Sequence, residues 1–96
     1  MTNDKLHYAE SILSAAIFVG GVIHSIPQPG RHHHIIDKMV VNGMKPWQWS
    51  SNDQGFLTST GRFVNRFEAM NIAKNSGQLL GKSPTVENEL FSEDLW

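Results

Sequence analysis

The chain has 96 residues, of which 40% are hydrophobic and 18% charged, a composition that excludes a disordered segment and fits one folded domain over residues 1–96. Eight Lys and Arg against nine Asp and Glu give a formal net charge of −1, which argues against binding of long nucleic acids through a broad positive field. Cysteine is absent, so disulfides, thiolate metal sites and cysteine nucleophiles are excluded.

The N-terminal segment has no apolar stretch behind a basic head. The longest apolar run, ILSAAIFVGGVI, is too short and too interrupted by glycine to span a bilayer. We therefore expect a soluble protein without a membrane partner, located in the cytoplasm.

Two short apolar runs predict a β-hairpin near the start of the chain. They are Ile12–Phe18 and Val22–Ile26, and they flank Gly20 and Gly21. Paired glycines supply the positive φ that a tight hairpin turn requires. Pro27 lacks a backbone donor, so the second strand should end near Ile26.

A helix is expected from about residue 31 to residue 42. Apolar residues repeat there with the spacing of one helical face, at Ile35, Ile36, Met39 and Val40. Asn42-Gly43 is a suitable C-terminal stop. The loop KPWQWSSND follows this helix and carries two tryptophans.

The second half predicts two more strands and a second helix. Gln54–Ser59 and Arg62–Val64 are expected as strands around the turn at Thr60-Gly61. Asn65 followed by Glu68 has the pattern of a helix N-cap with an acidic residue in the first turn. The apolar stripe of this helix is expected at Phe67, Met70, Ile72 and Ala73, with Gly77 closing it.

Residues 79–96 are expected as a looser tail. The predicted fold class is therefore α+β, with a small antiparallel β-sheet packed against two main α-helices in a single domain.

Three successive histidines, His32, His33 and His34, suggest a metal site, but consecutive helical side chains point about 100° apart and do not converge on one ion. We therefore expect no metal. An alternative is an anion site, because Arg31 offers a planar set of donors beside the free N–H groups of a helix start. A solvated helix start explains the same residues.

A second group of candidate residues lies in GFLTSTGRFVNRFEA, residues 55–69. Phe56 offers an aromatic face for a base, Thr58 a hydroxyl, and Arg62 and Arg66 cationic groups beside a helix start. These are the components of a small nucleotide pocket. The same pattern also fits phenylalanines filling a core beside solvated arginines.

The tryptophans Trp47, Trp49 and Trp96 fit either a recognition surface or a buried core and subunit interface. Acidic residues form no recognisable catalytic pair, and no nucleophile-elbow, Walker A or dinucleotide-binding motif occurs. No catalytic residue and no cofactor is therefore predicted.

The segments RHHH, GFLTSTGRFVNRFEAMNIAKNSGQ and FSEDLW, in this order, resemble the phage anti-Thoeris sponges of the first type. The similarity extends from about Ile12 to Trp96. Members of that family sequester, without cleaving, the cyclic nucleotide signals of bacterial immunity. These are chiefly cyclic ADP-ribose isomers and, for some members, the cyclic di- or trinucleotides of CBASS immunity.

The resemblance implies a protein of the host cytoplasm that assembles as dimers or hexamers with ligand pockets between subunits. By motif, Arg31, Phe56, Asn65 and Arg66 correspond to positions that contact phosphate, adenine or ribose. Lys82 is the basic residue nearest to the tail position where the family has a basic contact. The expected ligand-binding set is Arg31, His32, His33, Phe56, Thr58, Asn65, Arg66 and Lys82.

These observations predict a non-enzymatic binding protein that sequesters a cyclic nucleotide signal. One alternative is a phosphodiesterase or glycohydrolase that uses one of the three histidines as a base or metal ligand. Another is a phage protein-interaction module built on the tryptophans.

Overall fold

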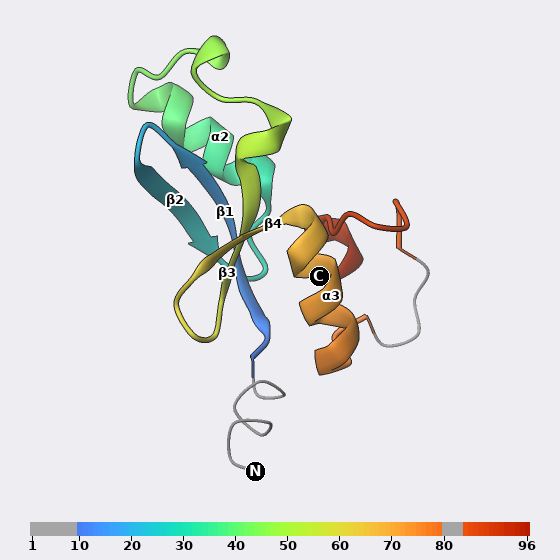
Figure 1. The fold of residues 1–96 in the computed structure, drawn as a ribbon. Helices are drawn as coiled ribbons and strands as arrows, with labels where there is room; N and C mark the ends of the chain where they lie inside the picture. Colours follow the sequence, from blue (N-terminus) through green and yellow to red (C-terminus); the bar gives the residue numbers. More distant parts are fainter. Residues whose placement is uncertain (1–9, 80–83) are drawn as a thin grey trace.

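A computed structural model describes residues 10–79 and 84–96, and Figure 1 shows its fold. Four strands form one antiparallel sheet, and two α-helices pack against it, so the predicted α+β class is confirmed. The elements are β1 (Ile12–Val19), β2 (Val22–Pro27), α2 (His32–Val41), β3 (Gln54–Thr58), β4 (Phe63–Asn65) and α3 (Arg66–Ser76). Short 3-10 turns lie at Pro46–Gln48, Ser51–Asp53 and Ser92–Asp94.

The strand order is β2-β1-β3-β4, so the N-terminal hairpin joins the second hairpin through β1 and β3. Gly20 and Gly21 form the turn between β1 and β2 with φ of 60° and 78°, as their pairing predicted. The register pairs Ala15 with both Ile26 and Phe56. Central β1 is thereby hydrogen-bonded on both sides.

One face of the sheet packs against both helices, and the opposite face is partly exposed, with Ala16 buried and Phe18 43% exposed. Side chains alternate along a strand, so the residues facing the helices are Ala15, Ile17, Phe56 and Val64, all at most 1% exposed. Both helices contribute to the same core, through Ile35, Met39, Ala69, Met70, Ile72 and Ala73. The opposite face presents Phe18 and Phe63, whose ring centroids are 5.6 Å apart.

Helix α2 occupies the predicted range, with Arg31 as its N-cap and Asn42 as its C-cap. The backbone N–H of Arg31 donates to Nδ1 of His34 at 2.8 Å, which satisfies a polar group at the helix start. Ile35 and Met39, one turn apart, are buried against the sheet. The apolar stripe predicted from the sequence therefore faces the core at these two positions.

The predicted capping of α3 is confirmed. Oδ1 of Asn65 accepts a 2.8 Å hydrogen bond from the backbone N–H of Glu68, and Gly77 ends the helix in the left-handed conformation. The predicted burial of Phe67 is wrong, because its side chain is 57% exposed. Ala69 and Met70, which are buried, follow Arg66 by three and four residues, so Arg66 lies on the same face of the helix as they do. The side chain of Phe67 is rotated by about 100° from that of Arg66 around the helix axis.

Gly55 lies where the starts of both helices approach the sheet. Its carbonyl oxygen accepts a 2.7 Å hydrogen bond from Nε2 of His32 at the start of α2. Its cross-strand partner is Asn65, the N-cap of α3. A Cβ at this position would overlap the carbonyl oxygen of Val64 and the ring of Phe63, so only glycine fits.

The C-terminal segment packs against both helix starts. The backbone N–H of Leu90 donates to the carbonyl of Arg66 at 3.0 Å, and Nε1 of Trp96 donates to the carbonyl of Gly30 at 2.8 Å. Leu90 is fully buried in the core. Figure 1 shows this red segment beside the start of α3, and the predicted loose tail is therefore an integral part of the fold.

A cluster centred on Glu10 ties the first described residue to the second hairpin. Its carboxylate accepts hydrogen bonds from the hydroxyls of Thr58 and Thr60 and from Nε of Arg62, at 2.7 to 2.8 Å. Arg62 also donates to Glu68 on α3 at 2.8 Å. The Arg62 guanidinium, assisted by the two hydroxyls, lowers the pKa of Glu10 from 4.5 to about 2.

Within residues 10–79 and 84–96, no helix combines the length and the apolar character required to cross a membrane.

Replacing Gly55 by alanine should destabilise the fold. The new methyl group must displace the backbone of β4, and overpacking of this kind costs about 1–3 kcal/mol. Urea unfolding followed by circular dichroism measures the loss. Ser25→Ala, at an exposed position of β2, is the control and should leave the midpoint unchanged. Equal midpoints for the two variants would refute the close approach at Gly55.

The Glu10→Gln variant should be less stable than the parent at pH 7. A carboxylate whose pKa is depressed to about 2 stabilises the folded state above its ordinary value of 4.5, and this stabilisation is lost as the pH falls toward 2. The difference in urea midpoint between variant and parent should therefore shrink below pH 4.5. Asp37→Asn, at an exposed position of α2, serves as the control. A difference that is constant from pH 7 to pH 3 would contradict this role.

Candidate functional site

Arg31 and Arg66 are brought toward each other by the packing of the two helix starts on the C-terminal segment. Arg31 is the N-cap of α2, and Arg66 is the first residue of α3. Both lie near Glu93, which is 4.0 Å from Nη1 of Arg31 and acts electrostatically on Arg66. Two cations at two helix N-termini make this region attractive to an anion.

Arg31 is only weakly paired. Its side chain is 28% exposed, and Glu93, at the limit of an ion pair, is 59% exposed. Nη1 of Arg31 is buried and makes no hydrogen bond within the described residues. An exposed carboxylate at this distance stabilises little, so the guanidinium retains donors for another group.

Arg66 is held more firmly. Nη2 donates to Oε1 of Gln54 at 2.7 Å, Nη1 donates to the carbonyl of Ser51 at 3.5 Å, and the guanidinium lies 4.3 Å from the ring centre of Phe91. Burial lowers the pKa of Arg66, and Glu89 and Glu93 partly oppose this effect. Nε is buried without a hydrogen-bond partner in the described part of the chain.

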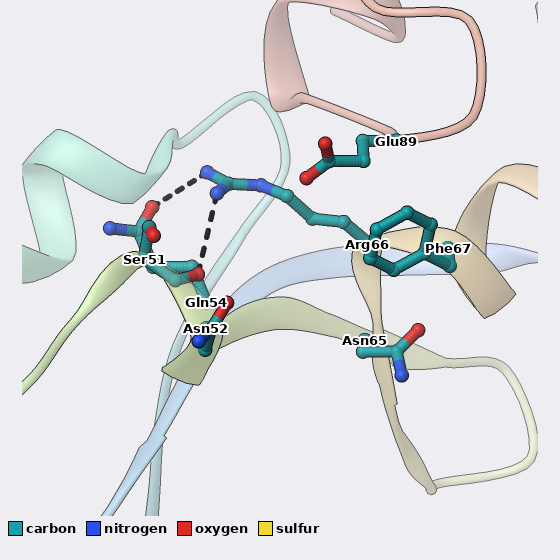
Figure 2. Close-up of a pocket in the computed structure, with 7 residues that line it drawn as sticks. All are labelled: Ser51, Asn52, Gln54, Asn65, Arg66, Phe67 and Glu89. Atoms are coloured by element: carbon teal, nitrogen blue, oxygen red, sulfur yellow. Dashed lines mark hydrogen bonds between the residues drawn. The ribbon is translucent and has the colours of Figure 1, made fainter.

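A hollow of about 220 Å³ surrounds this side chain, and we call it the Arg66 pocket. Its lining comes from the 3-10 turn before β3, from the start of α3 and from the tail: Ser51, Asn52, Gln54, Asn65, Arg66, Phe67 and Glu89. Figure 2 shows Arg66 extended across the pocket, with Glu89 on one side and Asn52 and Gln54 on the other. The pocket thus combines a cation, a carboxylate, amides and an aromatic ring.

Of the residues predicted from the sequence, Asn65 and Arg66 line this pocket. Arg31 does not line it, but it borders the same tail segment through Glu93. Lys82 lies outside the described residues.

Phe56 does not have the surface that its predicted stacking role requires. It is fully buried in the core, and its ring meets the His32 ring in an edge arrangement with centroids 5.0 Å apart. A base would have to open the core to reach it. The alternation of β3 explains the error, because Phe56 faces the helices.

His32 is likewise part of the core, with 6% exposure. Because a carbonyl oxygen only accepts, Nε2 of His32 donates to Gly55, and the imidazole has a structural partner. Burial lowers the pKa of His32, opposed in part by the bond to Gly55. The side chain of His32 therefore has a structural role and presents little surface to a ligand.

The remaining predicted residues lie away from the Arg66 pocket. His33 is exposed, and its ring lies beside that of His34 in a tilted arrangement with ring centroids 4.1 Å apart. Thr58 is 2% exposed and bonded to Glu10, so its hydroxyl serves the fold. Across the part of the chain that the structure describes, no group of three or more His, Asp or Glu side chains has the geometry of a metal site.

Sequence reasoning missed the roles of Glu89 and Phe67 in the pocket. Glu89 comes from the tail, and no spacing in the sequence relates it to α3. The apolar pattern predicts Phe67 in the core stripe of α3, whereas the i, i+3, i+4 relation of Arg66 to Ala69 and Met70 places Arg66 on that face. This relation is the sequence signal that indicates an outward-facing Phe67.

Comparison with protein families found one described as phage T4 y16D protein, whose profile matches residues 11–96. Comparisons with curated proteins and with solved structures found no match.

The parent protein should lose stability as the pH falls below 6.5, the ordinary pKa of histidine, and part of that loss should come from His32. Its depressed pKa means that the unfolded chain binds a proton before the folded chain does, so acid favours unfolding. Urea titrations between pH 8 and pH 5 measure the slope.

The His32→Gln variant should show a shallower slope, whereas Ser25→Ala, at an exposed position of β2 that carries no titratable group, should keep the slope of the parent. Identical slopes for the parent and His32→Gln would contradict the neutral, buried imidazole.

Proposed function

The chain belongs to the phage T4 y16D protein family, and from this phage origin and the Arg66 pocket we propose that it sequesters a cyclic nucleotide immune signal without cleaving it. The proposed signals are cyclic ADP-ribose isomers and the cyclic di- or trinucleotides of CBASS immunity. The proposed site of action is the host cytoplasm.

The observation that carries this proposal is the state of Arg66. Burial lowers the pKa of the Arg66 guanidinium, and this group makes no ion pair within 4.0 Å among the described residues. Arg66 also lines a pocket, and its Nε donor makes no hydrogen bond in the described chain. Keeping a cation in such a place is unfavourable unless a counter-charge is supplied. A phosphate group of a nucleotide would supply it, with charge-assisted hydrogen bonds.

The second cation would extend the site beyond the pocket. Near the same tail, Nη1 of Arg31 is a buried donor that makes no hydrogen bond in the described chain and lies 4.0 Å from Glu93. The start of α2 adds the positive end of its dipole. A hollow of about 220 Å³ is smaller than the roughly 300 Å³ at which pockets for drug-sized ligands begin. A cyclic nucleotide would therefore place one part in the pocket and leave the rest outside it.

A second subunit would enclose that remainder, and we propose that the protein acts as a homo-oligomer, either a dimer or a hexamer. The sheet face opposite the helices offers a surface for such contacts, since Phe18 and Ile23 are each 43% exposed. Apolar groups of this kind are typical of subunit interfaces.

Binding fits the arrangement better than cleavage by a histidine. The enzymatic alternative requires His32, His33 or His34 near the ligand, and none of them lines the Arg66 pocket. Sequestration instead requires tight binding, with sites comparable in number to the signal molecules.

A protein-interaction module is the second candidate function. Trp47 favours it, because this large side chain in the loop after α2 is 80% exposed. Trp96 does not, since its indole N–H is bonded to Gly30. This candidate predicts no stabilisation of the protein by any nucleotide.

The direct test is to incubate the purified protein with a cyclic ADP-ribose isomer, remove free ligand, denature the protein by heat and identify the released nucleotide by chromatography. Depletion before heating and recovery of intact ligand afterwards are expected. A changed product would favour the enzyme. Failure to deplete any candidate cyclic nucleotide would refute sequestration.

Arg66→Gln should weaken binding of the depleted nucleotide by about 10- to 150-fold, since a hydrogen bond to a charged group is worth about 1.5–3 kcal/mol. Lys74→Ala removes a positive charge from the same helix outside the pocket and should bind as the parent does. Isothermal titration calorimetry measures the affinities, and thermal unfolding verifies that both variants fold. Parent-like affinity for a folded Arg66→Gln would remove Arg66 from the site.

A further inference from the structure

Two groups that face the Arg66 pocket have unused hydrogen-bonding capacity of opposite kinds. Nε of Arg66 is a buried donor without a partner in the described chain. The carboxylate of Glu89 lies beside Arg66 in Figure 2, but the two form no ion pair within 4.0 Å, and no described residue donates a hydrogen bond to this carboxylate. A complementary ligand therefore brings an acceptor to Arg66 and a donor to Glu89.

Phe67 adds a flat apolar surface to the same pocket. It is 57% exposed, although it belongs to a helix whose other large apolar residues, Met70 and Ile72, are buried. It lines the pocket next to Arg66 and Asn65. An aromatic ring in this position can stack on a base, which Phe56 in the core cannot do.

We propose that the Arg66 pocket is a subsite for a nucleotide with an amino-bearing base, which stacks on Phe67 and donates its amino hydrogen to Glu89 while its phosphate meets Arg66. This inference rests on the proposed function and names the part of the signal that enters the pocket. It assigns stacking to Phe67 and base selection to Glu89.

Glu89 gives the subsite its selectivity. A carboxylate in the pocket disfavours ligands that carry only negative charge, and Glu93 nearby adds to that effect. A base without an amino donor leaves the carboxylate desolvated and unpaired, and sites built on a hydrogen bond reject such analogues strongly. The subsite should therefore distinguish a nucleotide both from a bare sugar phosphate and from a base that only stacks.

The probes are adenosine 5′-monophosphate, purine riboside 5′-monophosphate, which lacks the amino group, and ribose 5-phosphate, which lacks the base. Titrations monitored by NMR chemical shifts of the parent should show the tightest binding for adenosine 5′-monophosphate, weaker binding for purine riboside 5′-monophosphate and the weakest for the sugar phosphate. Phe67→Ala should weaken binding of adenosine 5′-monophosphate by about 5- to 150-fold, and Phe67→Tyr should retain it.

Glu89→Gln should reduce the preference for adenosine 5′-monophosphate over purine riboside 5′-monophosphate, whereas Glu87→Gln, an exposed neighbour in the tail, should not. Trp47→Ala controls for loss of an exposed aromatic outside the pocket. Equal affinities of the parent and Phe67→Ala would overturn the stacking assignment. An unchanged preference in Glu89→Gln would overturn base selection.

The subsite and the proposed function fail in different ways. If the parent binds none of the three probes, the subsite is refuted, while recovery of an intact cyclic nucleotide after heating still decides sequestration. If the parent and its variants behave as expected with the probes but no cyclic nucleotide is depleted, the subsite is supported and the sequestration proposal fails.

Discussion

The hydrogen bond from His32 to the carbonyl of Gly55 fixes the start of α2 on the sheet, and the rest of the site depends on it. Gly55 also pairs across the strands with Asn65, which caps α3. One residue without a side chain thus positions both helix starts, and with them Arg31 and Arg66. A larger side chain has no room there, because the Phe63 ring and the Val64 carbonyl occupy the space.

The C-terminal segment also positions the two helix starts. Leu90 is buried in the core and its backbone N–H donates to the carbonyl of Arg66, and the ring of Phe91 lies against the Arg66 guanidinium. It also brings Glu89 and Glu93 toward the two arginines. Arg66 is therefore held by hydrogen bonds and an aromatic contact without a close ion pair, and Arg31 is only weakly paired. Both guanidinium groups retain a buried donor that makes no hydrogen bond among the described residues.

Two histidines of the RHHH segment have structural roles. His32 is buried against Phe56, where burial lowers its pKa, and Nδ1 of His34 accepts a hydrogen bond from the backbone N–H of Arg31. The segment therefore builds and caps a helix start, and the charge there comes from Arg31. Phe56 and Phe67 show a similar division, since the first fills the core and the second faces the pocket.

The sequence alone determined the strands, both helices and the cap at Asn65, because hydrophobic period, glycine turns and N-cap chemistry act within a few residues. It also indicated Arg66 and Asn65 as candidate site residues. Only the tertiary structure decided that Phe56 is buried, that Phe67 is exposed and that Glu89 lines the same pocket as Arg66. Which face of an element is covered, and which distant segment lies across it, depends on packing between residues far apart in the chain, and local pattern carries no information about that.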